Sequence, residues 1–190
     1  MTQTSAPEIS SLEVAAIAAR IDRPVVLVGL MGVGKSTVGR RLAGLLDTGF
    51  ADADEAIEQA ADRTVSEIFA AHGEAYFREG ERRVIARLIE EGHGVVATGG
   101  GAFVDPATRE LILDRAIAVW LDCDVETLVE RTGRRDNRPL LRNGDPHEIL
   151  TDLKGRREEF YAQAHCRVVT GNAPHHATAL RILEAIDAWL

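Results

Sequence analysis

The residues best suited to chemistry by type and spacing lie at 29–36, where the sequence GLMGVGKS fits the pattern G-x-x-x-x-G-K-[ST]. Glycines at these spacings let the backbone curl around a phosphate chain, so that successive N–H groups point inward. A helix beginning at about Lys35 would add its positive dipole end. We expect Lys35 to reach the β- and γ-phosphates of a nucleotide and the Ser36 hydroxyl to bind Mg²⁺.

The context of this loop favours a nucleoside-triphosphate site over a chance glycine-rich turn. An apolar run over 24–28 leads into the loop, and apolar residues at helical spacing follow over 37–46. With the chain's own residue frequencies, a chance match would occur roughly one time in a thousand. Only two lysines occur in the chain, Lys35 and Lys154. The expected nucleotide-binding residues are Gly32, Val33, Gly34, Lys35, Ser36 and Thr37.

Two carboxylates follow next, at the end of a short strand predicted over 49–54. Asp52 and Asp54 are two positions apart, so their side chains would share one face of a strand. Ligands of open parallel sheets bind beyond the carboxyl ends of the strands, which would bring both residues to the phosphate loop. One carboxylate could then support Mg²⁺ and the other bind a substrate hydroxyl. Two solvated turn aspartates are the alternative, which the neighbouring phosphate loop disfavours.

Glycine and arginine patterns supply further candidates. Gly99, Gly100 and Gly101 follow a buried strand and would let a ligand approach the backbone closely, although a wide turn is also compatible. The stretch 131–142, RTGRRDNRPLLR, concentrates positive charge in an acidic protein. Such arginines suit a lid that closes over ATP, a solvated loop or a small RNA-contacting patch, and the lack of interleaved aromatics weakens the RNA interpretation.

Two other arginine sites remain ambiguous from the residues alone. Arg78 follows an apolar-aromatic pair inside a charged helix and, taken by itself, is typical of a surface arginine. Arg156 and Arg157 lie in another predicted helix, where they could be surface charge or a clamp for a carboxylate.

Composition excludes several classes of protein. A chain of 190 residues is most simply one domain, and its net charge of −8 argues against a general nucleic-acid binder. No apolar run approaches the ~18 residues of a membrane span, and the N-terminus lacks the pattern of a secretory signal. A disulfide between Cys123 and Cys166 is the alternative to two buried thiols in a reducing cytosol, and we expect the thiols. We expect the histidines to be surface residues. These features predict a cytoplasmic protein without nucleic-acid or membrane partners.

The elements that must position the candidate residues alternate between strands and helices. Strands are predicted over 24–28, 49–54, 94–98, 116–121 and 166–170, and helices over 12–21, 37–46, 106–114, 125–131, 147–164 and 174–190. The region 55–91 is almost entirely helical, with a capping box at Thr64 and Glu67 and a break at Gly73. This pattern predicts a five-stranded parallel sheet with helices on both faces and an inserted helical subdomain.

With these pieces in place, residues 22–185 resemble the shikimate kinases, a family of the nucleoside-monophosphate-kinase group of P-loop folds. The motifs that carry the resemblance are the run from Gly29, Asp52-x-Asp54, Phe77-Arg78, the triple glycine after Thr98, and Arg138-Pro139-Leu140. The resemblance implies a P-loop NTPase fold in a single domain over 1–190, expected to be a monomer. Within it would lie an N-terminal extension over 1–20, a substrate-binding insertion over about 54–92 and a lid over about 132–146.

The resemblance also implies a reaction, the transfer of the ATP γ-phosphoryl group to the 3-hydroxyl of shikimate in aromatic amino-acid biosynthesis. Lys35, Asp54 and Arg138 would be the catalytic residues. Asp54 would bind shikimate hydroxyls, either as the base or only as an anchor, and Asp52 would join Ser36 in supporting Mg²⁺, through water. Arg138 would be the lid arginine on the phosphates, and Arg131 would lie against the adenine.

The shikimate carboxylate would be held by Arg78 and Arg157, with backbone contacts from Gly99, Gly100 and Gly101. Where the family often has Arg-x-Pro-x-Tyr, this chain has REEFY at 157–161, which leaves the choice between Arg156 and Arg157 open. Three other functions stay in view: a P-loop kinase for another acceptor such as gluconate, a nucleotide-binding regulatory module, and a GTPase switch. The GTPase is disfavoured because the chain has no Asn-Lys-x-Asp signature.

Overall fold

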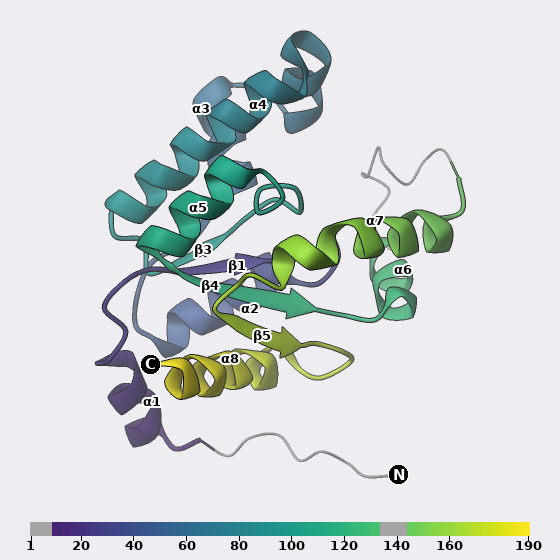
Figure 1. Ribbon diagram of the computed structural model, residues 1–190. Coiled ribbons are helices and arrows are strands. Elements are labelled where there is room, and N and C mark those ends of the chain that lie inside the picture. Colours follow the sequence, from purple (N-terminus) through teal and green to yellow (C-terminus); the bar gives the residue numbers. More distant parts are fainter. Residues whose placement is uncertain (1–8, 134–143) are drawn as a thin grey trace.

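A parallel sheet forms the centre of the molecule in the computed structural model, which describes residues 9–133 and 144–190. Within those residues the sheet has five strands in the order β2-β3-β1-β4-β5 (Figure 1). The strands are β1 (Val25–Val28), β2 (Phe50–Asp52), β3 (Val95–Ala97), β4 (Ile117–Asp122) and β5 (Cys166–Val169). In register, Val26 of β1 lies between Val96 of β3 and Ala118 of β4. The predicted parallel sheet is therefore confirmed.

Helices cover both faces of this sheet (Figure 1). They are α1 (Ser11–Ala18), α2 (Lys35–Leu45), α3 (Ala53–Ala61), α4 (Val65–Glu90), α5 (Pro106–Arg115), α6 (Val125–Gly133), α7 (Pro146–Tyr161) and α8 (His175–Trp189). Helices α2 and α8 pack together on one face, with α1 beyond them, and α4 and α5 pack together on the other. Helices α6 and α7 lie side by side at the end toward which the strands point. Because both faces are covered, β1, β3 and β4 are buried along their whole length.

Helices α3 and α4 extend away from the sheet, and we call residues 53–90 the α3–α4 lobe (Figure 1). The lobe has a small apolar cluster of its own, in which Ile57, Ile68 and Phe77 are buried. Helix α4 begins with the predicted capping box, in which Thr64 and Glu67 exchange hydrogen bonds. It bends at Gly73, whose φ of 80° and ψ of 176° are not helical. The predicted helical insertion and its break are thus confirmed.

The second strand is shorter than predicted. It ends at Asp52, and Asp54 lies in the first turn of α3 rather than on the strand. The reason is that Asp52 caps the helix: its Oδ1 accepts hydrogen bonds from the backbone N–H of Asp54 at 3.1 Å and of Glu55 at 3.5 Å. The expectation that the two aspartates share a strand face was therefore wrong, although both reach the same cavity.

The remaining predictions concern the leader helix, the cysteines, the histidines and possible membrane spans. The leader helix is present, and Val14 and Ile17 are buried as α1 packs on α8. Both cysteines are free and buried, as expected. His165 was wrongly expected to be a surface residue, because it is partly buried and its Nδ1 accepts a hydrogen bond from the Ala118 N–H at 3.0 Å. No helix in the described ranges combines the length and apolar character needed to cross a membrane.

Candidate active site

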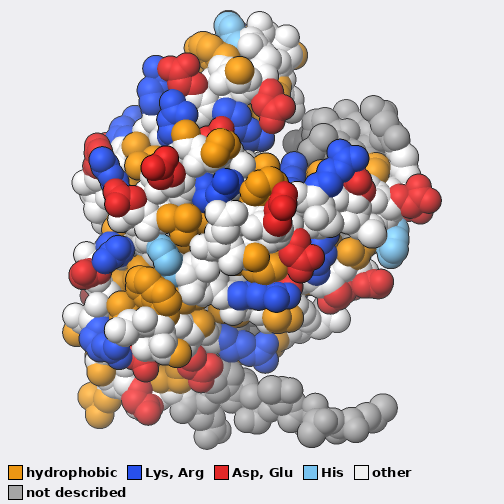
Figure 2. All heavy atoms as spheres, viewed as in Figure 1, with side chains coloured by type: hydrophobic (Ala, Val, Ile, Leu, Met, Phe, Trp, Pro, Cys, Tyr) orange, Lys and Arg blue, Asp and Glu red, His pale blue; other side chains and the backbone are white. Residues whose placement is uncertain are grey.

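A cavity of about 1040 Å³ opens at the carboxyl ends of the strands, between the α3–α4 lobe and the phosphate loop. In Figure 2 the α3–α4 lobe forms the top of the molecule. The cavity brings together residues that the sequence places more than 120 positions apart. The predicted site residues that line it are Gly32, Gly34, Lys35, Ser36, Thr37, Asp52, Asp54, Arg78, Gly99, Gly100, Gly101, Arg131 and Arg157. Val33 does not line it, and Arg138 lies outside the described residues.

The phosphate loop has the backbone that its glycines predict. Gly29, at φ 135°, lies so close to β4 that a side chain there would begin 2.4 Å from the carbonyl oxygen of Leu121. Gly34 precedes α2 in the left-handed region and offers no side-chain cap to the helix. The first N–H groups of α2 are therefore available to an anion. The buried Lys35 folds over the loop, where its Nζ donates to the carbonyl oxygens of Gly29 at 2.8 Å and Leu30 at 2.9 Å.

Ser36 and Asp52 provide adjacent oxygens next to this loop. The Ser36 hydroxyl donates to Asp52 Oδ2 at 2.6 Å. Hydroxyl and carboxylate oxygens suit Mg²⁺, which binds few protein ligands and completes its shell with water and phosphate oxygens. No cluster of three or more His, Cys, Asp or Glu side chains that could hold a metal occurs in the described part of the chain. The donor set thus fits a metal that a nucleotide helps to bind.

Asp54 faces the same cavity from the first turn of α3. Burial raises the pKa of its carboxyl, and the negative charge of Asp52 adds to this, whereas Lys35 and Arg78 oppose it. A side chain at Gly99 would begin 2.8 Å from Asp54 Oδ1, so any residue other than glycine would displace this carboxylate. The carboxylate is therefore desolvated but still lies in the field of two cations.

Glu81 is a site residue that the sequence analysis did not identify. Its side chain is 1% exposed, and its Oε2 accepts a hydrogen bond from Arg78 Nη1 at 2.5 Å. Its Oε1 is buried without a hydrogen-bond partner and lies 3.2 Å from where a side chain at Gly99 would begin. Burial raises the pKa of Glu81 to about 7, with Arg78 opposing the shift. The sequence could have indicated this pair, because Glu81 follows Arg78 by three residues in a predicted helix and side chains at that spacing lie next to each other.

Arg78 and Arg157 approach the triple-glycine segment from different helices. The Arg78 guanidinium occupies the space that a side chain at Gly101 would need, since such a side chain would begin 2.2 Å from Arg78 Nη2. Arg157 Nη1 donates to the carbonyl oxygen of Gly100 at 3.0 Å. Arg156, by contrast, has a side chain that is 75% exposed and pairs with Asp152. Of the two adjacent arginines, Arg157 is the one that faces the cavity.

Helix α7 is fixed at two points, which determines where Arg157 lies. The Tyr161 hydroxyl donates to the carbonyl oxygen of Gly100 at 2.5 Å, and its ring stacks on Trp120 of β4. About two turns earlier along the helix, Lys154 Nζ lies 3.0 Å from Asp122 Oδ1 at the end of β4. Burial of Asp122 opposes its ionisation, but hydrogen bonds from Arg167 and Lys154 prevail and hold its pKa below the ordinary value. Lys154 does not line the cavity, but by fixing α7 it stabilises the position of Arg157.

Arg131 marks the other end of the cavity. Its guanidinium donates to the carbonyl oxygens of Val33, at 3.1 Å, and of Gly171, at 2.5 Å. Asn172 and His175 line the cavity beside it and were also missed by the sequence analysis. The signal for them was their place just beyond β5, because ligands of such sheets lie past the strand ends.

Comparisons with known proteins give a consistent result. A protein-family model described as shikimate kinase matches residues 31–187. A shikimate kinase of Novosphingobium aromaticivorans is 63% identical over 186 residues, which cover 96% of each chain. Among solved structures, the shikimate kinase from Acinetobacter baumannii in complex with shikimate is 39% identical, with a TM-score of 0.84, over 90% of this chain and 97% of that one. A gluconokinase from Sinorhizobium meliloti, at 16% identity and a TM-score of 0.58 over 88% of this chain and 93% of its own, shares the fold.

Proposed function

Since the chain belongs to the shikimate kinase family, we propose how its own residues carry out the ATP-dependent phosphorylation of shikimate. The reaction gives shikimate 3-phosphate and ADP, and it belongs to the pathway to chorismate and the aromatic amino acids. One observation carries the proposal: a single cavity contains the phosphate loop, the Asp54 carboxylate and the Arg78 and Arg157 guanidinium groups. The two arginines are suited to bind a second anion. Phosphoryl transfer needs such positioning and charge neutralisation more than covalent chemistry.

The phosphate end of the cavity would bind ATP. Backbone N–H groups of the loop and the start of α2 would surround the phosphates, and Lys35 would exchange its carbonyl partners for the β- and γ-phosphate oxygens. Ser36 and, through water, Asp52 would hold Mg²⁺, which when bound neutralises charge on the phosphates. Arg131 would lie against the adenine, as its contact with the loop beyond β5 supports. Arg138 is proposed as the arginine that closes over the phosphates.

The acceptor end of the cavity would bind shikimate by its carboxylate. Arg78 and Arg157 come from different helices and flank the glycines at 99–101, so they could enclose a carboxylate with planar, bidentate hydrogen bonds. Before shikimate binds, Glu81 would hold the Arg78 guanidinium in the position from which it contacts the shikimate carboxylate. The glycines would allow the ring of the acceptor to lie close to the backbone.

Asp54 lies between the two ends, and we propose that it receives the proton of the 3-hydroxyl. As the hydroxyl oxygen forms its bond to the γ-phosphorus, the bond from that phosphorus to the β–γ bridging oxygen breaks and ADP leaves. The proton released by the hydroxyl passes to the Asp54 carboxylate. Its pKa, raised by burial, supports this role because a desolvated carboxylate accepts a proton more readily than a solvated one.

The free thiols support a reducing compartment, and we propose that the enzyme works in the cytoplasm. Cys123 and Cys166 are both buried and unpaired with each other. Disulfides are rare in reducing compartments, where thiols stay in this form.

The test is ADP release from Mg-ATP with and without shikimate, with gluconate as the rival acceptor. We expect ADP release to rise with shikimate and to stay at the background rate with gluconate. A rise with gluconate instead would overturn the proposed acceptor site while leaving the phosphate site in place. ATP binding without any shikimate-stimulated release would favour a regulatory nucleotide-binding module.

A further inference from the structure

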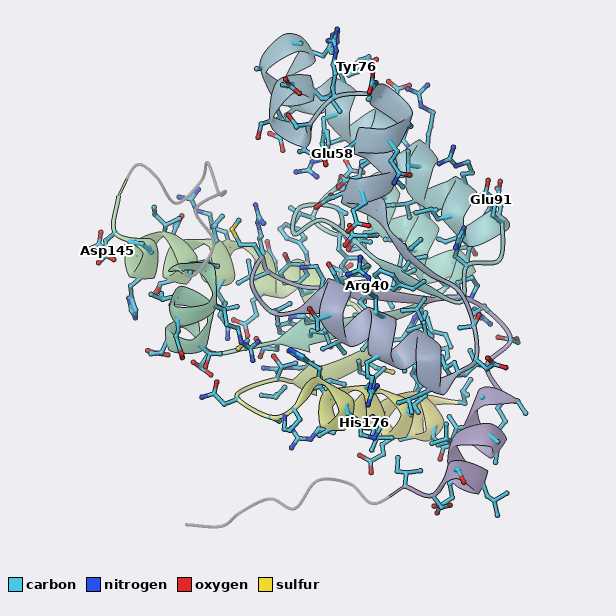
Figure 3. The ribbon with its side chains drawn as sticks, turned by 180° about the vertical axis from the view of Figure 1, so that it is seen from behind. Arg40, Glu58, Tyr76, Glu91, Asp145 and His176 are labelled. Atoms are coloured by element: carbon cyan, nitrogen blue, oxygen red, sulfur yellow. The ribbon has the colours of Figure 1, made fainter. Side chains whose placement is uncertain are left out.

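A second hollow of about 510 Å³ lies on the α3–α4 lobe, and we call it the outer groove. Its apolar wall comes from Ile57, Ile68, Phe77 and Val84. Tyr76, which Figure 3 labels near the tip of the lobe, lines it with a side chain that is 51% exposed. Its ring is tilted against that of His72, with ring centroids 4.5 Å apart. The groove has the volume of a small-molecule site and both apolar and aromatic surface for a ligand to contact.

The charge of the outer groove is opposite to that of the protein. The chain has 30 acidic and 22 basic residues, yet Arg63 and Arg83 line the groove and none of the described lining residues is acidic. Arg83 is 66% exposed and lies 3.6 Å from Glu79, a separation typical of a weak surface pair. Arg63 acts electrostatically on Glu67, which lies outside the groove lining. The groove therefore offers guanidinium groups to an anionic ligand.

The outer groove is separate from the active-site cavity but touches it through one wall. Among the described lining residues, Phe77 is shared by the two hollows. The next residue, Arg78, lines the active-site cavity and not the groove. A ligand in the groove would therefore press on the helix segment that carries Arg78, without occupying the place of shikimate or ATP.

We propose that the outer groove is a binding site for a small arylalkyl monocarboxylate. The aryl ring would lie against the exposed Tyr76 ring and the partly buried Val84 side chain, where apolar surface is still open to water. The buried side chains of Ile57, Ile68 and Phe77 form the floor beneath it. The alkyl chain would lead the carboxylate out to Arg63 and Arg83, because a guanidinium matches the two oxygens of a carboxylate. The site goes beyond the proposed reaction and does not depend on it.

Calorimetric titration with 3-phenylpropionate tests the proposal when the protein is first saturated with shikimate. Saturation with shikimate occupies Arg78 and Arg157, so heat from the titration does not come from the acceptor end of the active site, and the variants below separate the groove from the phosphate end. We expect saturable binding of 3-phenylpropionate and at least about tenfold weaker binding of 3-phenylpropan-1-ol, which lacks the charge. No saturable binding of the acid, or equal binding of acid and alcohol, would overturn the proposal.

Three variants locate the binding. Gly80 lines the groove within α4, and a side chain there would meet nothing within 4 Å, so Gly80→Leu should fill the groove and abolish binding. Arg83→Gln should weaken binding about tenfold. Arg87→Gln is the matched control, because Arg87 is an exposed arginine on the same helix that pairs with Glu91 and does not line the groove. It should bind like the wild type.

The variants are checked for folding by circular dichroism before titration. If Gly80→Leu fails to fold, the two arginine variants still test the site. Arg83→Gln should lose affinity for 3-phenylpropionate, whereas Arg87→Gln should keep it. Undiminished binding in both Gly80→Leu and Arg83→Gln, or displacement of the probe by shikimate, would place the probe elsewhere and refute the outer groove as its site.

Discussion

The two ends of the active-site cavity are built in different ways. The phosphate loop follows β1, whose residues are fully buried at the middle of the sheet, and leads into α2, which packs on α8. The acceptor end depends on the α3–α4 lobe, whose own apolar cluster buries Ile57, Ile68 and Phe77. The phosphate end is thus held by the large continuous core alone, whereas the outer part of the lobe, which carries Arg78, also depends on a small satellite cluster.

The difference shows two means of positioning a side chain. Lys35 is placed by backbone geometry and by packing beneath it, so its position follows from the fold. Arg78 is placed by an ion pair with Glu81, a residue of its own helix, inside a lobe that bends at Gly73. Regions with few buried apolar contacts open at lower free-energy cost, so we expect the acceptor end to be the more mobile one.

The largest loss of turnover should follow substitution of Asp54, which lies between the phosphate end and the acceptor end of the cavity. Asp54→Asn removes the proposed proton acceptor, and we expect turnover to fall by roughly a thousandfold or more. ATP binding, measured by calorimetry, should be spared because the phosphate loop is untouched. Asp62→Asn, at the other end of α3, is the control and should keep its turnover. Turnover like that of the wild type in Asp54→Asn would remove Asp54 as base and as anchor.

Truncations in the two apolar clusters should separate stability from substrate binding. Leu27→Ala, at a fully buried position of β1, should lower the free energy of unfolding by roughly 2–5 kcal/mol. Ile68→Ala, in the lobe cluster, should lower it less but raise the KM for shikimate and not that for ATP. Urea denaturation and steady-state kinetics give the two quantities. Equal effects of both variants on stability and on the two KM values would contradict the comparison.

Glu81 predicts a pH dependence of stability. Its pKa is about 7 in the folded protein against an ordinary 4.5, so between these pH values the folded state binds more protons than the unfolded state. The free energy of unfolding should therefore fall as pH rises through this window, by on the order of 3 kcal/mol from this residue. Glu81→Gln should flatten the profile measured by urea denaturation at pH 4.5–8. An unchanged profile would show that Glu81 titrates normally.

The two adjacent arginines of α7 should differ in their effect on the acceptor. Arg157→Gln should raise the KM for shikimate roughly ten- to hundredfold, because a hydrogen-bonded charge partner of the carboxylate is lost. Arg156→Gln removes only an exposed pair with Asp152 and should leave that KM unchanged. The KM for ATP should change in neither variant. If Arg156→Gln raised the KM for shikimate more than Arg157→Gln, Arg156 rather than Arg157 would be the residue that binds the carboxylate.

The phosphate end was predictable because local sequence determines it. The glycine pattern, the apolar run before it and the helix after it follow from neighbouring residues, and they recur in the structure with Lys35 and Ser36 where expected. The helix start after β2 was misjudged because Asp52 both ends a strand and caps a helix, and sequence spacing alone does not distinguish these roles.

The acceptor end was less predictable because its residues act on one another across elements. Arg78 taken alone was compatible with the protein surface, and only its ion pair with Glu81 and its position in the space that a side chain at Gly101 would need place it in the cavity. Choosing between Arg156 and Arg157 required the position of Gly100, which lies more than fifty residues away in sequence. Glu81 was overlooked because a glutamate within a charged helix is ordinarily solvated.

The chain contains two tryptophans, and their places give the two regions separate optical signals. Trp120 is buried in β4 and contacts both the Tyr161 ring of α7 and the Arg167 guanidinium, so its fluorescence would respond when α7 shifts around a bound acceptor. Trp189 lies at the end of α8 against His165, away from the cavity. Emission from the natural protein can therefore report ligand-induced movement and loosening of the helix ends without any added dye.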